Sequence, residues 1–259
     1  MNIVKTFNAE KLVVNIYNSR EKMGTAAASD VADRIKKLLS AKSEINMVFA
    51  AAPSQNEFLD ELIKVKDIEW RKINAFHLDE YIGLAEDAPQ RFGRYLYDRI
   101  FSKVPFNTIN YLNGNAEDIE AECDRYAELI KSHPIDIACI GIGENGHIAF
   151  NDPPVADFND KFMIKKVKLD NKCRMQQVHD GCFESIDKVP EYALTMTVPA
   201  IFAAKYIFCI VPGSTKAEAV RKAVEGPIEE TCPASILRRH ENAGLYLDRD
   251  AATLLNKFW

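Results

Sequence analysis

Short apolar runs that alternate with amphipathic segments are the feature of this chain that most constrains its fold. The amphipathic segments have the spacing of surface helices, and the apolar runs have the length of buried strands. The predicted strands are Ile45–Ala51, Ile73–His77, Ile135–Ile142 and Tyr206–Val211. The predicted helices are Thr25–Leu39, Asn56–Val65, Arg91–Phe101 and Ala116–Ser132. Because polar residues hardly interrupt the apolar runs, we predict a doubly wound α/β fold, Rossmann-like, whose mostly parallel sheet carries helices on both faces.

Composition excludes several classes of protein. No repeat or linker-like stretch divides the chain, so we expect one domain over residues 1–259. The net charge of −5 comes from mixed signs without a basic stripe, and this argues against a nucleic-acid partner. No apolar run reaches the roughly 18 residues that span a membrane, and the N-terminus lacks the apolar region of a signal peptide. The six cysteines form no C-x-x-C pair, which favours reduced packing thiols over a zinc site. We therefore expect a cytoplasmic protein.

The stretch G-I-G-E-N-G, residues 141–146, has the letters of a dinucleotide-binding fingerprint. Such a fingerprint requires a helix that begins at the glycines and holds a pyrophosphate at its N-terminus. Pro153 and Pro154 follow shortly afterwards, and a proline inside a helix costs about 3 kcal/mol. The sequence therefore predicts no dinucleotide site. We expect instead that glycines such as Gly143 let the backbone approach a ligand closely or take positive φ.

Polar side chains follow two of the predicted strands, at the sheet edge where ligands bind in such folds. Asp79 and Glu80 follow the second strand, and His147 follows the third. Adjacent carboxylates are also typical of a solvated loop, and a lone histidine is often a structural group. If the two faced one crevice, they would form a base and an acid for moving protons on a small polar substrate. Asn145 and Asp152 favour the acid–base interpretation of His147, since an Asp beside a histidine fixes its tautomer.

Four segments carry a resemblance to a known family. The segments F-H-L-D-E-Y-I-G-L, G-I-G-E-N-G-H-I-A-F-N-D-P-P, V-P-E-Y-A-L-T-M-T-V-P and C-P-A-S-I-L-R-R-H occur in the order and spacing of the glucosamine-6-phosphate deaminase/isomerase family, which is related to the 6-phosphogluconolactonases. The resemblance covers the chain from about Thr25 to Asp248. It implies conversion of a 2-amino-2-deoxyhexose 6-phosphate to fructose 6-phosphate and ammonia, without metal or organic cofactor. The D-E-Y and G-H-I-A-F-N-D-P segments are similar to the deaminase branch, whereas lactonases tend toward G-H-T-A-S-L-F-P.

The resemblance also assigns roles to five residues. It implies that Asp79 moves the proton between C2 and C1 of the sugar. His147 is expected to assist the opening of the pyranose ring, with Asn145 and Asp152 in the positions that orient it. Asp152 stands where the family usually has Glu, and we expect this shorter side chain to reach the imidazole through a water. Lys216, in P-G-S-T-K-A, matches a lysine that contacts the 6-phosphate as a point charge.

The phosphate loop departs from the family pattern. Residues 52–57 lack the glycine-rich turn whose backbone amides cradle the phosphate in the family. Ser54, Gln55 and Asn56 are the candidates to donate hydrogen bonds in its place. The alternative is that these three side chains cap the N-terminus of the helix that follows them.

A further arginine that often clamps the phosphate in the family has no counterpart here. Asp180 lies in that neighbourhood and would repel a phosphate. Arg91 is the candidate to compensate, the alternative being that it lies on a solvated helix face. We place Glu80 and Gly143 with Arg91 in the predicted substrate-binding set. A rebuilt phosphate grip leaves open a substrate other than glucosamine 6-phosphate.

Two other functions stay open at this point. One is a lactonase-type hydrolase, and the other is a sugar-phosphate-binding protein without activity. A homo-oligomer is compatible with the family, but one chain does not decide it.

Overall fold

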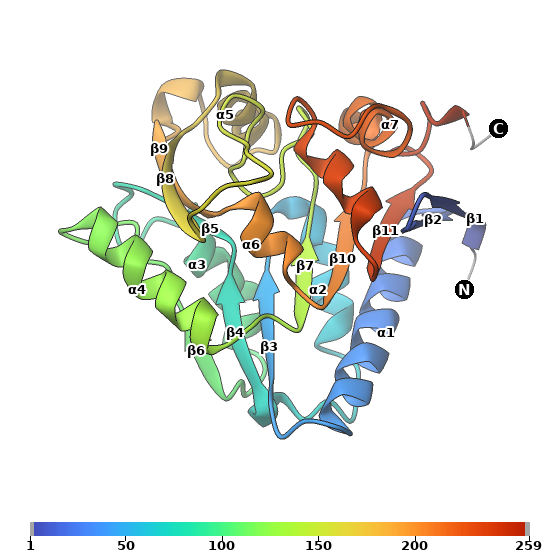
Figure 1. Ribbon diagram of the computed structural model, residues 1–259, viewed down its shortest axis with the longest axis horizontal. Coiled ribbons are helices and arrows are strands. Elements are labelled where there is room, and N and C mark those ends of the chain that lie inside the picture. The colour runs from blue at the N-terminus through green and yellow to red at the C-terminus, as the bar shows by residue number, and fades with distance from the viewer. Residues whose placement is uncertain (1–2, 257–259) are drawn as a thin grey trace.

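The computed structural model describes residues 3–256 and contains two β-sheets (Figure 1). The large sheet contains β1 (Ile3–Ala9), β2 (Leu12–Tyr17), β3 (Ile45–Phe49), β4 (Ile73–His77), β6 (Thr108–Asn110), β7 (Ile137–Ile140), β10 (Tyr206–Val211) and β11 (Ala243–Asp248). Its strand order is β1-β2-β11-β10-β7-β3-β4-β6. All neighbours are parallel except β1, which pairs antiparallel with β2 at one edge. The predicted mostly parallel sheet is therefore confirmed.

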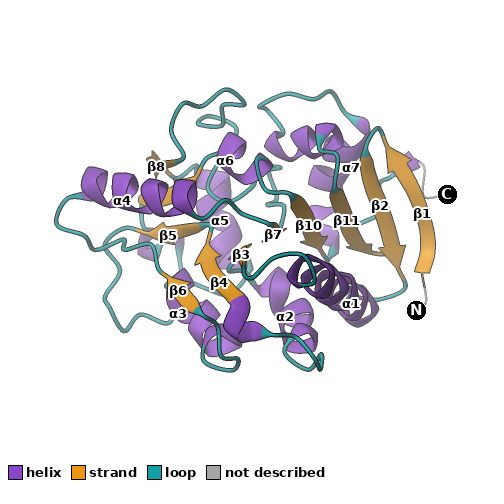
Figure 2. Ribbon diagram, turned by 60° about the horizontal axis from the view of Figure 1, so that its bottom comes forward, coloured by secondary structure: helices purple, strands orange, loops and turns teal. Residues whose placement is uncertain are grey.

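Helices cover both faces of this sheet (Figure 2). The covering helices are α1 (Arg20–Leu39), α2 (Asn56–Leu62), α3 (Phe92–Leu96), α4 (Ile119–Ser132), α6 (Val198–Phe202) and α7 (Ala217–Glu225). Helix α5 (Asn171–His179) lies above the strand ends, beside the small sheet. Side chains of α1, α2 and α3 pack in one apolar core, and those of α4, α6 and α7 pack in another. Successive strand residues point to opposite cores: Val48 joins the second and Phe49 the first. The chain is thus doubly wound, as predicted.

The predicted elements agree with the structure to within a few residues. Strands β4 and β10 have the predicted bounds, whereas β3 and β7 are shorter than predicted. The first helix begins earlier than predicted, at Arg20, because Ser19 accepts a hydrogen bond from the amide of Lys22 and caps it. The predicted helix over residues 91–101 consists of α3 and a wider π-helical turn over Tyr97–Phe101. No helix follows the glycines at residues 141–146, in line with the absence of a dinucleotide fold motif.

A second sheet of three strands lies beside the first and contains the segment after β4. Its strands are β5 (Asp79–Tyr81), β8 (Ile164–Lys168) and β9 (Tyr192–Met196), in the order β5-β9-β8, all antiparallel. The chain passes from one sheet to the other at Leu78. The Leu78 amide donates to Phe49 of the large sheet, and its carbonyl accepts from the Met196 amide of the small sheet. Both sheets therefore fix the backbone next to Asp79.

Two further expectations bear on the chain as a whole. Within residues 3–256, no helix has the length and apolar character needed to cross a bilayer. All six cysteines are free thiols, and five of them are buried, as expected for packing residues.

Candidate active site

A pocket of about 150 Å³ is lined by residues that follow β3, β4, β7 and β10 and by residues of α5. Figure 1 shows these strand ends below α5. Ser54 follows β3, Asp79 follows β4, and Lys216 follows β10. The loop after β7 contributes Gly143 and His147. The structure therefore brings five of the predicted site residues together at the carboxyl edge of a parallel sheet, which is where ligands bind in doubly wound folds.

Asp79 is the buried carboxylate of this pocket. Its side chain is 6% exposed, and burial, followed by the neighbouring Glu80, holds its pKa well above the usual range of an aspartate. The backbone of Asp79 is fixed by His77, whose Nδ1 donates to the Asp79 carbonyl at 2.9 Å. Because Nε2 of His77 accepts from the Leu112 amide, that imidazole is held as one neutral tautomer. A carboxylate with a raised pKa on a fixed backbone is suited to accept a proton from a carbon acid.

His147 lies against the backbone of Gly143. A Cβ at residue 143 would come within 2.1 Å of both Cε1 and Nε2 of the imidazole. Glycine is therefore required there by the closeness of the ring, and Gly143 contributes to the site by making room for His147. Of the three glycines in this loop, Gly146 alone has a positive φ, of 87°.

The Nδ1 side of the imidazole contacts both predicted orienting residues. Nδ1 lies 2.7 Å from Asn145 Oδ1 and 2.9 Å from Asp152 Oδ1. The amide orientation of Asn145 is fixed because its Nδ2 donates to Asp152 Oδ1 while its Oδ1 accepts from the backbone amide of His147. Both neighbours of Nδ1 are acceptors, so the proton lies on Nδ1 and Nε2 is free to act as a base.

Asp152 reaches the imidazole directly, so our expectation of an intervening water is wrong. The shorter side chain suffices because the chain turns back within five residues of His147, with bridge pairing of Ile148 and Asn151. Although burial would raise the pKa of Asp152, hydrogen bonds from His147 and Asn145 and the charge of the imidazolium lower it. Asp152 is therefore an ionised partner for His147.

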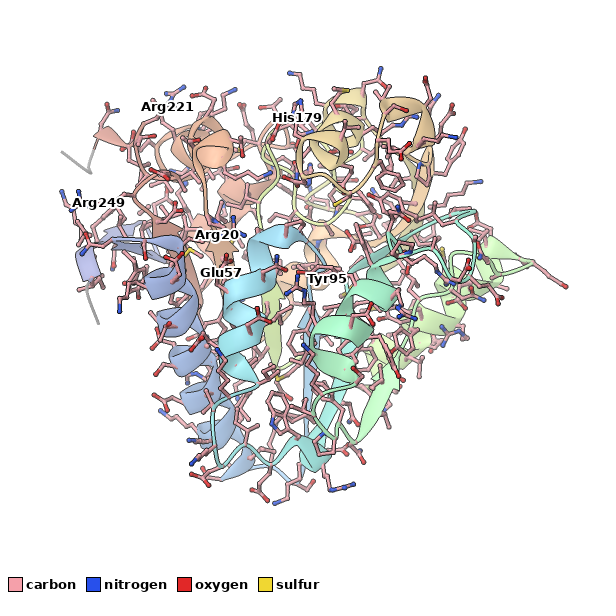
Figure 3. All side chains as sticks on the ribbon, turned by 180° about the vertical axis from the view of Figure 1, so that it is seen from behind. Arg20, Glu57, Tyr95, His179, Arg221 and Arg249 are labelled. Atoms are coloured by element: carbon pink, nitrogen blue, oxygen red, sulfur yellow. The ribbon has the colours of Figure 1, made fainter. Side chains whose placement is uncertain are left out.

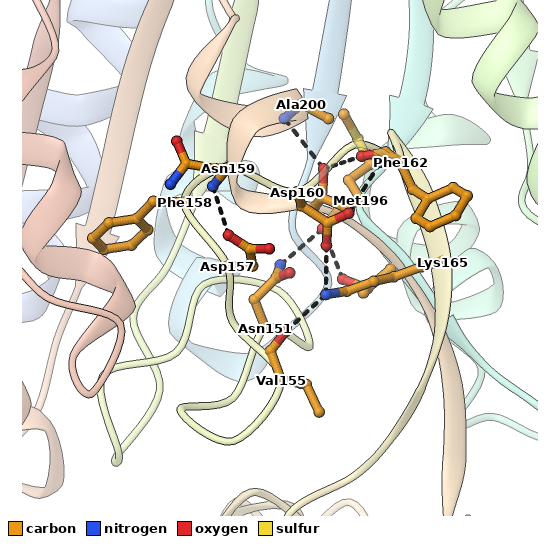
Figure 4. A network of polar contacts seen from close by, with 12 residues as sticks. Asn151, Val155, Asp157, Phe158, Asn159, Asp160, Phe162, Lys165, Met196 and Ala200 are labelled. Carbon is orange, nitrogen blue, oxygen red and sulfur yellow. Dashed lines mark hydrogen bonds and ion pairs between the residues drawn. The ribbon is translucent and has the colours of Figure 1, made fainter.

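The loop after His147 is held in place by buried polar contacts (Figure 4). Nδ2 of Asn151, which is fully buried, donates to the carbonyls of Ile148 and Met196 at 2.9 and 2.8 Å. Lys165 closes the following segment by donating to the Val155 carbonyl and pairing with Asp160, both at 2.7 Å. These contacts tie the catalytic loop to the small sheet, which also carries Asp79.

Lys216 provides a cation in the lining of the pocket. It is the last residue of the 3-10 turn Ser214–Lys216 and is 5% exposed, and its Nζ makes no hydrogen bond to any group in residues 3–256. Burial lowers its pKa, while the Asp180 and Glu144 carboxylates raise it in part. Oε1 of Glu144, also without a hydrogen bond, lies 4.0 Å from Nζ. A buried ammonium that lacks hydrogen bonds is ready to bind an anionic group.

The loop that replaces the glycine-rich turn is fixed by its own side chains. Ser54 lines the pocket. Gln55 is buried and donates to the Ile210 carbonyl, and Asn56 Oδ1 lies 2.6 Å from the Tyr95 hydroxyl. None of the three side chains caps the helix, because a 3-10 turn precedes α2, and the capping alternative is therefore wrong. Gln55 and Asn56 support the loop from outside the pocket lining.

Glu80 and Arg91 point away from the pocket. The Glu80 carboxylate accepts hydrogen bonds from the amides of Tyr81, Phe92 and Gly93 at 2.9 to 3.0 Å, so it fixes the start of α3. Arg91 lies 4.0 Å from Glu80 and lines a separate hollow with Tyr97 and Tyr111. The structure therefore does not bring Arg91 to the predicted phosphate end, and it gives Glu80 a supporting position.

The pocket also contains residues outside the predicted binding set. Asp180, which we expected to repel a phosphate, does line it. Arg20 reaches it from the first turn of α1, although nothing in the local sequence marks this residue. Other lining side chains are Phe92, Phe150, Gln176, Gln177 and Thr215. Gln176 and Asp180 are four positions apart, a spacing that places both on one face of a helix, and this was the available sequence signal that they line the pocket together.

One group of potential metal ligands lies beside the pocket. Ligand atoms of His147, Asp152 and Cys173 lie within 4.8 Å of one another. Burial, and then the Asp152 carboxylate, hold the pKa of the Cys173 thiol well above its usual range. A thiol that stays protonated disfavours metal binding, which requires the thiolate.

Comparison with known proteins identifies related enzymes. Glucosamine-6-phosphate deaminase of Listeria monocytogenes is 39% identical over 213 residues, which cover 82% of this chain and 88% of the relative. Glucosamine-6-phosphate deaminase 1 of Bacillus subtilis is 37% identical over 240 residues, or 90% of this chain and 96% of the relative. The solved structure of a monomeric glucosamine-6-phosphate deaminase superposes with a TM-score of 0.84 at 36% identity, covering 93% of this chain and 99% of that one.

A more distant structure shares the fold alone. The 6-phosphogluconolactonase of Thermotoga maritima superposes with a TM-score of 0.72 at 20% identity, over 91% of this chain and 98% of that one. The family of glucosamine-6-phosphate isomerases and 6-phosphogluconolactonases matches residues 18–246 by its sequence model. Because the match covers most of the chain and includes every residue that lines the pocket, the chain belongs to this family.

Proposed function

We propose that this protein is an amino-sugar-phosphate deaminase/isomerase. It converts a 2-amino-2-deoxyhexose 6-phosphate, either glucosamine 6-phosphate or an epimer, to a ketose 6-phosphate and ammonia. The observation that carries the proposal is the placement of Asp79 and His147 in one pocket, with the imidazole held at Nδ1 by Asp152. The names of the related enzymes and their 35–39% identity over most of the chain support it.

In the first step, His147 opens the pyranose ring. Its Nε2 takes the proton of the C1 hydroxyl and returns a proton to the ring oxygen, which leaves an aldehyde at C1. Asp152 stabilises the imidazolium that forms in between, and Asn145 keeps the ring in the orientation where Nε2 faces the pocket. Gly143 contributes the space that this orientation needs.

In the second step, Asp79 transfers a proton from C2 to C1. The aldehyde makes the C2 proton acidic, so a carboxylate can remove it to give an enolamine. Return of the proton to C1, with transfer of one amine proton to the oxygen on C1, leaves a hydroxymethyl group at C1 and an imine at C2. Water then adds to the imine, and loss of ammonia leaves the carbonyl group of the ketose. The raised pKa of Asp79 makes it a stronger base than an ordinary carboxylate.

The substrate phosphate binds at the Lys216 side of the pocket in this proposal. Ser54 and Thr215 are hydroxyl donors on the same lining, and the Lys216 ammonium is free of hydrogen bonds within the described chain. The mechanism requires no metal or organic cofactor, since proton transfers and hydration account for every bond that changes.

The proposal extends to the setting of the enzyme. We infer one catalytic domain over residues 1–259 and a small sugar phosphate as partner, with no role for nucleic acid. The free thiols support a reducing, cytoplasmic location. Assembly into a homo-oligomer stays a prediction, and one structural relative is described as monomeric.

Coupled ammonia release tests the proposal. The substrates are glucosamine 6-phosphate, galactosamine 6-phosphate and unphosphorylated glucosamine, each with the wild type and with His147→Gln. We expect ammonia from one phosphorylated sugar and its loss in the variant. If none of the sugars is turned over, a pH-stat assay with 6-phosphogluconolactone distinguishes the hydrolase, which releases acid. Thermal stabilisation by these sugars without turnover would indicate a binding protein.

A further inference from the structure

The phosphate end of the pocket has fewer positive groups than a phosphate dianion requires. Lys216 faces two carboxylates, those of Asp180 and Glu144, which both raise its pKa. Asp180 itself lines the pocket. The loop over residues 52–57 has no glycine whose amide could approach the anion. Lys216 alone therefore leaves this end without net positive charge.

Arg20 is the second cation of the same lining. It is the first residue of α1, and it lines the pocket together with Pro53 and Ser54. Figure 3 shows it next to Glu57. Its side chain is 35% exposed, so it is open to a ligand. The N-terminus of a 20-residue helix carries a partial positive charge, which adds to that of the guanidinium at this point.

The guanidinium is held in place by part of its donors. Nε donates to Glu57 Oε1 at 2.6 Å in an ion pair that offsets part of its charge, and Nη2 donates to the Pro53 carbonyl. These bonds use two of the five N–H groups of an arginine. The remaining three make no hydrogen bond within residues 3–256, so a fixed guanidinium presents free donors to the pocket. Such an arrangement suits an oxyanion, because little side-chain entropy is lost on binding.

The packing of two helices brings this arginine to the site. A Cβ on Gly24 would come within 2.6 Å of the Glu57 Cβ, so glycine allows α1 to approach the start of α2 closely. The loop over residues 52–57 is anchored by Tyr95 (Figure 3), whose hydroxyl donates a hydrogen bond to the Ala52 carbonyl at 2.7 Å. The position of Arg20 relative to Ser54 is therefore fixed by the scaffold.

We propose that Arg20 is a specificity-determining residue that binds the 6-phosphate of the substrate together with Lys216. It takes the place of the missing glycine-rich turn. This inference rests on the proposed function, since it assumes an amino-sugar phosphate in the pocket.

Kinetics of Arg20→Gln test the inference. We expect KM for glucosamine 6-phosphate, or for whichever phosphorylated sugar the wild type accepts, to rise about 10-fold or more, with kcat within about 3-fold, as for loss of a charged hydrogen bond. Arg20→Lys keeps the charge, and its KM should lie between those of the wild type and of Arg20→Gln. Competitive inhibition by inorganic phosphate should weaken in parallel. The matched control is Arg221→Gln, an exposed arginine paired with Glu218 outside the pocket, which should leave KM unchanged.

Glu57→Gln separates binding from a purely structural tie. If Arg20 only joined α1 to α2, both variants would lower the melting temperature and change KM alike. If Arg20 binds the phosphate, Glu57→Gln keeps the cation, and KM does not rise. An unchanged KM in Arg20→Gln, with an active wild type, would overturn the inference.

The failure of the proposed function has a different signature. In that case the wild type would release no ammonia, whichever sugar is offered. Thermal stabilisation by inorganic phosphate is then the readout for Arg20. Its loss in Arg20→Gln, but not in Arg221→Gln, would still support an anion site at Arg20, and equal stabilisation of all three proteins would overturn it.

Discussion

The imidazole of His147 lies so close to the α-carbon of Gly143 that a methyl group there would come within 2.1 Å of Nε2. Gly143→Ala must therefore displace the ring or the loop. We expect kcat to fall roughly a hundredfold, since an error of about 1 Å in a catalytic group has that effect. Gly141→Ala is the matched control, because its Cβ would meet no atom closer than 3.3 Å: Gln55 Nε2 at 3.3 Å, and the Ile210 carbonyl and Ser54 Oγ at 3.5 Å. Ammonia release by both variants checks this, and equal losses would contradict it.

Replacement of Asp79 by Asn should abolish activity and stabilise the fold. Loss of the base is expected to lower kcat about a thousandfold. The folded-state pKa of Asp79 is raised above its ordinary value of 3.8, so its ionisation costs stability as pH rises through and beyond that value. Asp79→Asn should therefore melt at a higher temperature than the wild type at pH 7 and show no gain near pH 3. Thermal unfolding across that range measures the difference, and a variant less stable at pH 7 would refute the argument.

Asn145→Asp places a second carboxylate beside the imidazole. The new charge, at the position of an oxygen 2.7 Å from Nδ1, favours the imidazolium. We expect the limb of the pH–rate profile that depends on His147 to move to higher pH, on the order of one unit. The variant also loses the amide donor to Asp152, so it should be less stable. A profile of kcat/KM against pH decides this: an unmoved limb would mean that Asp152 alone sets the charge of the ring.

The buried His77 should make the fold sensitive to acid. Burial lowers its pKa from 6.5 to about 4, with a smaller contribution from Arg91. The unfolded chain binds a proton below pH 6.5 that the folded chain binds only near pH 4. The free energy of unfolding therefore decreases as the pH is lowered from 6.5 to about 4, by up to about 3 kcal/mol. Denaturant unfolding of the wild type and His77→Gln should show a shallower decline in the variant. Parallel declines would assign the acid sensitivity to other groups.

The sequence predicts the centre of the large sheet well, because its strands are buried on both faces. Strands β4 and β10 are uninterrupted apolar runs and have the predicted bounds. The β8 strand, Ile164–Lys168, lies at the edge of the small sheet and reads I-K-K-V-K, in which two adjacent lysines break the period of two expected for a half-buried strand. The β5 strand has the sequence D-E-Y, which is typical of a solvated loop. In the structure the strand is buried, and Glu80 accepts hydrogen bonds from three backbone amides. Burial of these charges is a tertiary effect.

The site divides in the same way. Asp79, His147 and Lys216 follow recognisable strands, and the topology of a parallel sheet suffices to bring them together. Arg20 begins a helix that is distant in sequence from all of them, and only the packing of α1 at Gly24 brings it to the pocket. Arg91 has the charge that a phosphate ligand needs. Glu80, however, accepts a hydrogen bond from the adjacent Phe92 amide, and Arg91 lines a hollow separate from the pocket. Residues that closely follow a recognisable strand were thus predictable, whereas Arg20, which follows none of the four predicted strands, was not.

The passage of the chain between the two sheets at Leu78 constrains the position of the base more strictly than that of the cations. Leu78 is bonded to Phe49 and Met196, so sliding of one sheet over the other would break a bond beside the base. Asp79 is therefore constrained by the architecture itself. The cations Arg20 and Lys216 are placed by helix starts, which can drift or be exchanged without moving the base. A lineage can in this way change the group that it recognises at one end of a sugar while it inherits the same proton transfer at the other.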